Sequence, residues 1–283
     1  MYASKGPIVE ELADRRFFRP IGWRMATALL PTRISADAVT LASLALGVLA
    51  GHLFWYRSAS VNAAGVLLFI ASDLLDSVDG QLARLRGTST RMGRVLDGLA
   101  DSSRFLSLYG HLAARLYAAG WGWGGVALAI AALFSHSYQA AAADFIRQAY
   151  LHFAVGEGDE LDVPEQADIG NGNSFWGRVS TWIYGDYTRR QAWLFPRTTA
   201  LVRTWSGREV PDSLRRSWAR RQRWVVSGCA WIAQNIRFLL LALTAVPHWP
   251  AAYCWIVVGP LNAVLVVLIL AHERVPKFHA QLA

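Results

Sequence analysis

The sequence predicts an all-α, polytopic membrane protein with six transmembrane helices and an N-terminal amphipathic helix in the membrane interface. Three observations support this fold class. Apolar residues (the set AVILMFWYC) make up 54% of the 283 residues, whereas only 17% are charged. There are 13 Trp, a residue that concentrates at bilayer interfaces. This composition excludes a disordered chain, a coiled coil and a disulfide scaffold.

The first region, residues 1–35, is expected to form a helix on the cytoplasmic surface of the membrane. Between residues 8 and 30, apolar and basic side chains alternate so that one helical face can meet acyl chains while the other meets headgroups. The apolar positions are Ile8, Val9, Leu12, Phe17, Phe18, Ile21 and Trp23, and the basic ones are Arg15, Arg16 and Arg19.

Six apolar segments follow, and a span needs about 20 residues to cross about 30 Å of hydrocarbon. They are residues 36–56, 62–84, 93–118, 124–148, 224–246 and 251–271. The first four make up region 36–149, and the last two, with a cytoplasmic tail, make up region 224–283. Cys229 and Cys254 begin consecutive antiparallel spans and therefore lie near opposite membrane faces, so we expect no disulfide between them.

A polar insertion, residues 150–223, separates the fourth and fifth spans. Its acidic, glycine-rich first part, residues 156–173, is expected to form a loop. Its later part mixes Trp with Arg, which is typical of short helices that lie on anionic lipid headgroups. The task of the insertion stays open.

The distribution of basic residues predicts the orientation. Of the 28 Lys and Arg, 24 fall in segments that alternating spans place on one side of the membrane. We expect the protein to lie in the inner (cytoplasmic) membrane. The positive-inside rule then predicts that both termini are in the cytoplasm. Because the net charge of +8 is sorted by membrane side, it indicates contact with membrane lipids, and we expect no nucleic-acid partner.

The second and third spans carry the candidate chemistry. Asp76 and Asp79 are three residues apart, and Asp97 and Asp101 are four apart, so each pair shares one helical face. An antiparallel helix pair joined by residues 85–92 would bring both acidic stripes to a similar depth. Each ionised Asp at the bilayer centre costs at least about 2.5–3.5 kcal/mol, so four are not expected to remain as bare anions.

Two divalent cations would balance four carboxylates. Oxygen ligands alone favour Mg²⁺, Mn²⁺ or Ca²⁺ over zinc, and paired cations suit phosphoryl transfer. The small residues Gly80, Ala83 and Gly93 leave room beside the carboxylates for a substrate to approach the backbone. We therefore predict a two-metal site for Mg²⁺ or Mn²⁺.

This stretch resembles the CDP-alcohol phosphotransferase family, whose signature is DxxDGxxAR, eight residues, and then GxxxDxxxD. Every signature position is present: Asp76, Asp79, Gly80, Ala83, Arg84, Gly93, Asp97 and Asp101. The resemblance implies transfer of a phospho-alcohol group from a CDP-linked donor to a hydroxyl, with release of CMP. It implies metal ligation by Asp76, Asp79, Asp97 and Asp101, with Asp101 also the catalytic base. It implies a nucleotide site at Thr40, Gly80, Ala83, Arg84 and Gly93.

The substrates are less sharply defined by the sequence. We expect the reaction to belong to phospholipid synthesis, with CDP-diacylglycerol as the preferred donor and a small alcohol as the acceptor. We also expect the protein to be a homodimer. A head-group transferase that uses CDP-inositol, CDP-choline or CDP-ethanolamine with a lipid acceptor is the alternative. An ion-coupled transporter and a catalytically silent scaffold are rivals of other classes. The roles of Asp73, near the acidic motif, and of Arg237, within the fifth span, are left open.

Overall fold

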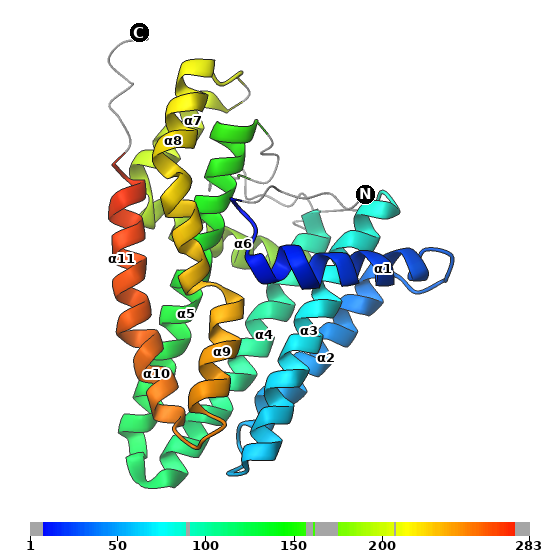
Figure 1. The fold of residues 1–283 in the computed structure, drawn as a ribbon, viewed down its shortest axis with the longest axis vertical. Helices are drawn as coiled ribbons and strands as arrows, with labels where there is room; N and C mark the ends of the chain where they lie inside the picture. Colours follow the sequence, from blue (N-terminus) through cyan, green and yellow to red (C-terminus); the bar gives the residue numbers. More distant parts are fainter. Residues whose placement is uncertain (1–7, 89–90, 157–160, 162–174, 207, 275–283) are drawn as a thin grey trace. The chain divides into compact units, whose positions relative to one another are not determined.

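The computed structural model describes residues 8–88, 91–156, 161, 175–206 and 208–274, and all regular elements in these ranges are helical, as predicted (Figure 1). The helices are α1 (Arg19–Leu29), α2 (Ala36–Leu53), α3 (Ala59–Leu85), α4 (Arg91–Leu116), α5 (Gly122–Tyr150), α6 (Phe175–Leu194), α7 (Pro196–Trp205), α8 (Asp212–Gly228), α9 (Gln234–Thr244), α10 (Pro250–Val258) and α11 (Pro260–His272). Four short turns of π- or 3₁₀-helix extend or join them: Asp14–Phe18, Tyr117–Trp121, Leu151–Val155 and Cys229–Ile232.

The helices divide into two compact units. One unit is Met1–Ser137 with Gln234–Leu261, and the other is Tyr138–Ala233 with Asn262–Ala283. The first unit contains α2, α3 and α4, which carry the predicted site. The second contains the Trp- and Arg-rich helices α6, α7 and α8.

Five helical segments are long and apolar enough to cross a membrane: Ala36–Leu53, Ala59–Leu85, Leu96–Val155, Asp212–Thr244 and Pro250–His272. The third has 60 residues and contains both the third and fourth predicted spans. At 1.5 Å per residue it would extend about 90 Å, three times the hydrocarbon thickness, if it were one straight helix. The positive φ angles of Gly120 (91°) and Gly122 (54°) break it into α4 and α5. The count of six spans stays a prediction.

The last two predicted spans are interrupted helices. Ala233 adopts an extended conformation (ψ 177°) between the turn that follows α8 and the start of α9. Gly259 breaks the path from α10 to α11, where Pro260 contributes no backbone N–H. The described residues include Cys229 and Cys254, and neither forms a disulfide, as predicted.

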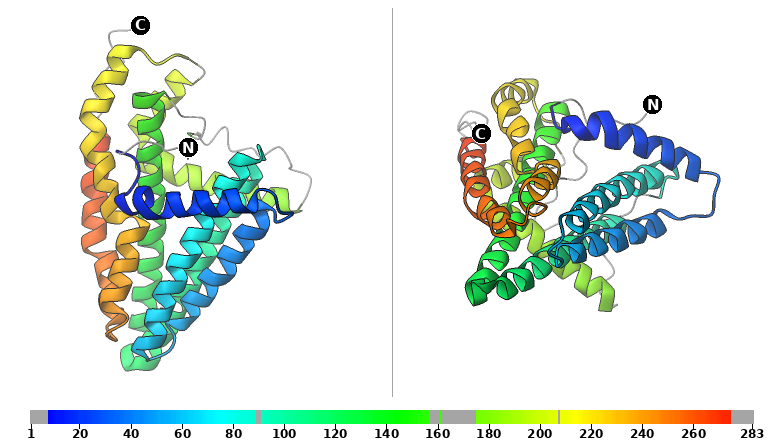
Figure 2. Two further views of the ribbon diagram at one scale, coloured as in Figure 1. Left: turned by 45° about the vertical axis from the view of Figure 1, so that its right-hand side comes forward. Right: turned by 60° about the horizontal axis from the view of Figure 1, so that its bottom comes forward.

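The N-terminal segment is helical from residue 14 to residue 29, and its place in the membrane interface stays a prediction. Helix α1 lies across one end of α3 (Figure 2). The buried contact between these elements and α2 is apolar and consists of Ala26, Val39, Val78 and Leu82.

Paired serines fix the register of α2 against α3. The Ser43 hydroxyl donates to the Ser72 carbonyl at 2.7 Å, and the Ser72 hydroxyl donates to the Ser43 carbonyl at 2.8 Å. Both residues are fully buried. Since small polar residues let membrane helices approach closely and bond across the interface, this pair holds the two helices where α3 presents its carboxylates.

The insertion has helical structure in its later part. Its predicted loop, residues 156–173, lies almost entirely outside the described residues. Helix α8 begins at Asp212 and continues to Gly228, so it runs through the predicted boundary between residues 223 and 224. Its placement on headgroups stays a prediction.

Candidate active site

Three aspartates from α3 and α4 converge, which agrees with the predicted meeting of the two acidic stripes. Asp76, Asp79 and Asp97 each offer a carboxylate oxygen, and these oxygens all lie within 4.8 Å of one another. Asp79 is buried, with 5% of its surface exposed, and the other two are half-buried. The helix pair therefore concentrates negative charge at one point of the first unit.

The donor set fits a hard divalent cation. Carboxylate oxygens are the ligands that Mg²⁺ and Mn²⁺ prefer, and the mutual repulsion of three neighbouring carboxylates falls when a cation binds between them. Asp97 Oδ1 is buried and has no hydrogen-bond partner among the described residues. A bound cation would satisfy that oxygen. The predicted cofactor is therefore compatible with the residues present, and the identity and number of the ions stay predictions.

Thr40 orients one of these carboxylates. Its hydroxyl lies 2.6 Å from Asp79 Oδ2 and donates a hydrogen bond to it. This contact fixes the Asp79 carboxylate against α2. The predicted nucleotide contact of Thr40 stays a prediction, because the hydroxyl is engaged by Asp79 here.

Asp101 lies one turn beyond Asp97 on α4, outside the group of three. Its carboxylate forms an ion pair with Arg104, and 48% of its side chain is exposed. Among the described residues, the potential metal-binding group consists of Asp76, Asp79 and Asp97. The predicted roles of Asp101 as a metal ligand and as the catalytic base therefore stay predictions.

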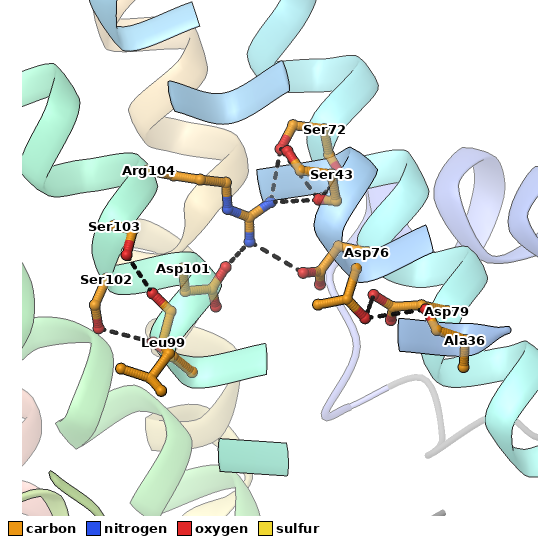
Figure 3. Close-up of polar contacts among 12 residues, drawn as sticks. Ala36, Ser43, Ser72, Asp76, Asp79, Leu99, Asp101, Ser102, Ser103 and Arg104 are labelled. Carbon is orange, nitrogen blue, oxygen red and sulfur yellow. Dashed lines mark hydrogen bonds and ion pairs between the residues drawn. The ribbon is translucent and has the colours of Figure 1, made fainter. Parts of the chain in front are cut away.

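Arg104 connects the acidic residues to the serine pair, and sequence reasoning missed it. Its guanidinium donates to Asp76 Oδ1 at 3.0 Å and to the Ser72 hydroxyl at 2.9 Å, and it also pairs with Asp101 (Figure 3). A further bond reaches the Ser43 hydroxyl at 3.2 Å. A spacing signal was present, because Asp97, Asp101 and Arg104 stand at positions i, i+4 and i+7 of one helix.

A glycine on α2 admits this buried arginine. A Cβ atom at Gly47 would lie 2.2 Å from Cδ of Arg104, far inside van der Waals contact. The Arg104 side chain is 2% exposed and crosses the position that a larger residue would fill.

The charge balance inferred from sequence counted only the carboxylates. Arg104 adds one positive charge that is present without any metal.

We expect Arg104→Met to lower turnover by about 10–100-fold, the usual size of an effect on a residue that positions the groups around a metal. The substitution removes the bond to Asp76 and the ion pair with Asp101 while keeping most of the buried volume. The fall should appear in kcat, with the KM for the donor changed little, and Arg104→Lys should recover part of it. Steady-state kinetics measure both constants. Arg57→Met, at an exposed position, is the control, and an equal loss there would contradict a positioning role.

The predicted nucleotide residues surround the join between α3 and α4. Gly80, Ala83 and Gly93 are half-buried, and Arg84 is exposed. A Cβ at Gly80 would approach no described neighbour more closely than 3.5 Å, the distance to Arg84 Nη1. Space therefore exists beside the carboxylates, and binding of cytidine there stays a prediction.

Two further residues were left open by the sequence. Arg237 on α9 is buried, with 1% exposed, and hydrogen-bonds Tyr253 of α10. Tyr253 in turn lies 3.4 Å from Tyr109 between the hydroxyl oxygens. These contacts favour a structural role for Arg237 within its own unit. Asp73 is half-buried on α3 and is not one of the three clustered aspartates.

The fold and the site together define a helical membrane protein with an acidic, cation-compatible centre between two of its helices. Residues 33–151 match the family described as CDP-alcohol phosphatidyltransferase. All four aspartates of the motif, and Arg104, lie inside the matched residues. Residues 33–151 are therefore similar to a CDP-alcohol phosphatidyltransferase domain.

Curated relatives share this part of the chain. A phosphatidylinositol phosphate synthase from Mycobacteroides abscessus is 35% identical over 129 residues, which are 43% of this chain and 53% of that protein. A CDP-diacylglycerol–serine O-phosphatidyltransferase from Helicobacter pylori is 32% identical over 37% of this chain and 42% of its own length. A CDP-diacylglycerol–inositol 3-phosphatidyltransferase from Drosophila melanogaster is 46% identical over 19% of this chain and 24% of its own length. The chain thus spans about half the length, or less, of these relatives.

Proposed function

We propose that this protein is a divalent-metal-dependent CDP-alcohol phosphotransferase that acts in phospholipid synthesis. It transfers a phosphatidyl group from CDP-diacylglycerol to an acceptor hydroxyl and releases CMP. The observation that carries the proposal is the convergence of Asp76, Asp79 and Asp97 within 4.8 Å inside helices apolar enough to span a membrane. A carboxylate cluster is costly in such helices without a cation, and a lipid-linked substrate requires the membrane location.

Each residue of the site has a distinct task in this proposal. Asp76, Asp79 and Asp97 hold the metal, which when bound neutralises charge that develops on phosphate oxygens. The hydroxyl oxygen of the acceptor attacks the β-phosphorus of the donor, and the bond between this phosphorus and CMP breaks. Asp101 accepts the proton that the hydroxyl loses. Arg104 holds Asp101 and Asp76 in position through the ion pair and hydrogen bond described above.

The names of the relatives support CDP-diacylglycerol as the donor and indicate which acceptor alcohols to test first. CDP-diacylglycerol appears in two of the names, and phosphatidylinositol phosphate synthase appears in three. An inositol phosphate is therefore the first acceptor to test, followed by inositol and serine. The sorting of basic residues supports an active site that opens to the cytoplasm and the inner leaflet, with both termini cytoplasmic. The homodimer stays a prediction.

The test is product formation by the purified full chain. The protein is incubated with CDP-diacylglycerol and each acceptor, CMP is quantified, and the lipid product is identified by mass spectrometry. CMP should form only when donor and acceptor are both present. Chelation by EDTA should abolish its release, and Mg²⁺ or Mn²⁺ should restore it.

Three outcomes would overturn the proposal. CMP release from a CDP-linked head group, with CDP-diacylglycerol inert, would identify the head-group transferase. Ion-driven uptake into proteoliposomes without CMP release from any CDP-alcohol would identify a transporter. Activity that survives exhaustive chelation would remove the metal from the mechanism.

A further inference from the structure

The second unit carries a groove that lies outside the matched catalytic domain. It has a volume of about 880 Å³ and runs between α8, with the turn that follows it, and α11. These two helices lie side by side (Figures 1 and 2). The groove involves none of the candidate site residues, so its role can be tested separately from the proposed reaction.

Small and apolar side chains form the floor of the groove. Gly228 on α8 faces Leu268 on α11, and a Cβ at Gly228 would lie 2.8 Å from Cδ2 of Leu268. Ala263 and Val267 of α11 line the same groove and are exposed. Because both helices belong to segments apolar enough to span a membrane, this surface is suited to a hydrocarbon chain.

Helix α8 and the turn that follows it line one side of the groove with arginine side chains at one end and tryptophan side chains beyond them. Arg220, Arg223, Trp224 and Trp231 all line the groove and are exposed, and their spacing places them along one helical stripe. From Arg220 to Trp231 the chain rises about 16 Å, which is about half of the hydrocarbon thickness, the depth of one leaflet. In the described residues no carboxylate pairs with Arg220 or Arg223.

We propose that this groove binds one phospholipid with an anionic headgroup. The phosphate and headgroup oxygens of the lipid accept hydrogen bonds from Arg220 and Arg223, because one guanidinium group can donate two parallel hydrogen bonds to one phosphate group. One acyl chain follows the floor past Gly228 and Ala263, and Trp224 and Trp231 pack along it. The charge at one end selects an anionic over a zwitterionic lipid, while the small floor residues give the chain room.

Native mass spectrometry of the detergent-solubilised full chain tests this proposal. The protein is titrated with phosphatidylglycerol or with phosphatidylcholine, and retained lipids are counted. Wild type should retain one phosphatidylglycerol. The double variant Arg220→Gln/Arg223→Gln should bind this lipid about 30-fold more weakly, because each basic residue near a lipid surface contributes about 1 kcal/mol to binding. The matched control is Arg216→Gln/Arg221→Gln, two exposed arginines of α8 that do not line the groove.

A second variant tests the acyl-chain part of the site without changing any charge. Val267→Trp, at a position that is 56% exposed, should fill the groove and abolish retention of the specific lipid. Equal loss in the Arg216/Arg221 control would show attraction to general surface charge, and equal retention of both lipids would show annular binding only. Either result, or full retention in Val267→Trp, would overturn the proposal. CMP release measured in parallel reports separately on the catalytic site.

Discussion

Asp79→Asn is expected to lower CMP release by about 1000-fold or more, because several kcal/mol of electrostatic stabilisation depend on the metal that this carboxylate holds. Asp79 is the most buried of the three clustered aspartates and is already oriented by Thr40. Asparagine keeps the shape of the side chain but loses the negative charge and one strong oxygen ligand. The measurement is the initial rate of CMP release at increasing Mg²⁺ or Mn²⁺.

A matched control lies two turns earlier on the same helix. Asp73→Asn removes an equal charge from α3 at a residue outside the three-carboxylate group, and it should leave CMP release nearly unchanged. Comparable losses in Asp73→Asn and Asp79→Asn would mean that overall negative charge matters and not a localised metal site. Wild-type activity in Asp79→Asn would contradict its role as a ligand.

Asp101→Asn should reduce turnover by about 10²–10⁴-fold, the contribution that a positioned general base usually makes. An amide cannot accept the proton of the acceptor hydroxyl. The protein should still fold, because Arg104 keeps its bonds to Asp76, Ser43 and Ser72 when Asp101 is changed. Thermal unfolding should therefore differ little from that of wild type, so the loss of activity can be assigned to chemistry.

The control for Asp101→Asn is its exposed neighbour on α4. Among the described residues, the hydroxyl of Ser102 donates to the Gly98 carbonyl of its own helix and to no other group, so Ser102→Ala should retain activity. Asp101→Glu tests position, because it keeps the carboxylate but moves it by about one methylene, and it should recover only part of the rate. Unchanged turnover in Asp101→Asn would exclude this residue as the base and turn attention to another acceptor of the proton.

The periodicity of the motif predicted most of the acidic site. Helical spacing placed Asp76 and Asp79 on one face of α3 and Asp97 and Asp101 on one face of α4. The structure brings the first three together and leaves Asp101 outside the group. The all-α class and the absence of a disulfide between Cys229 and Cys254 followed from composition and from the alternation of spans. The helix breaks at Ala233 and Gly259 were not predicted, although the sequence carries local signals for both: Gln234 and Asn235 follow Ala233, and Pro260 follows Gly259.

The sequence by itself determined the helical class, the resemblance to a family and the helical face that each pair of aspartates shares, because hydropathy and helical spacing are local properties of the chain. Only the tertiary structure decided that Arg104 crosses Gly47 to reach Asp76 and Asp101, and that α8 and α11 leave a groove beside Gly228. These features arise where residues far apart in sequence come into contact. Such contacts depend on the packing distance and register between helices, which no single helix encodes.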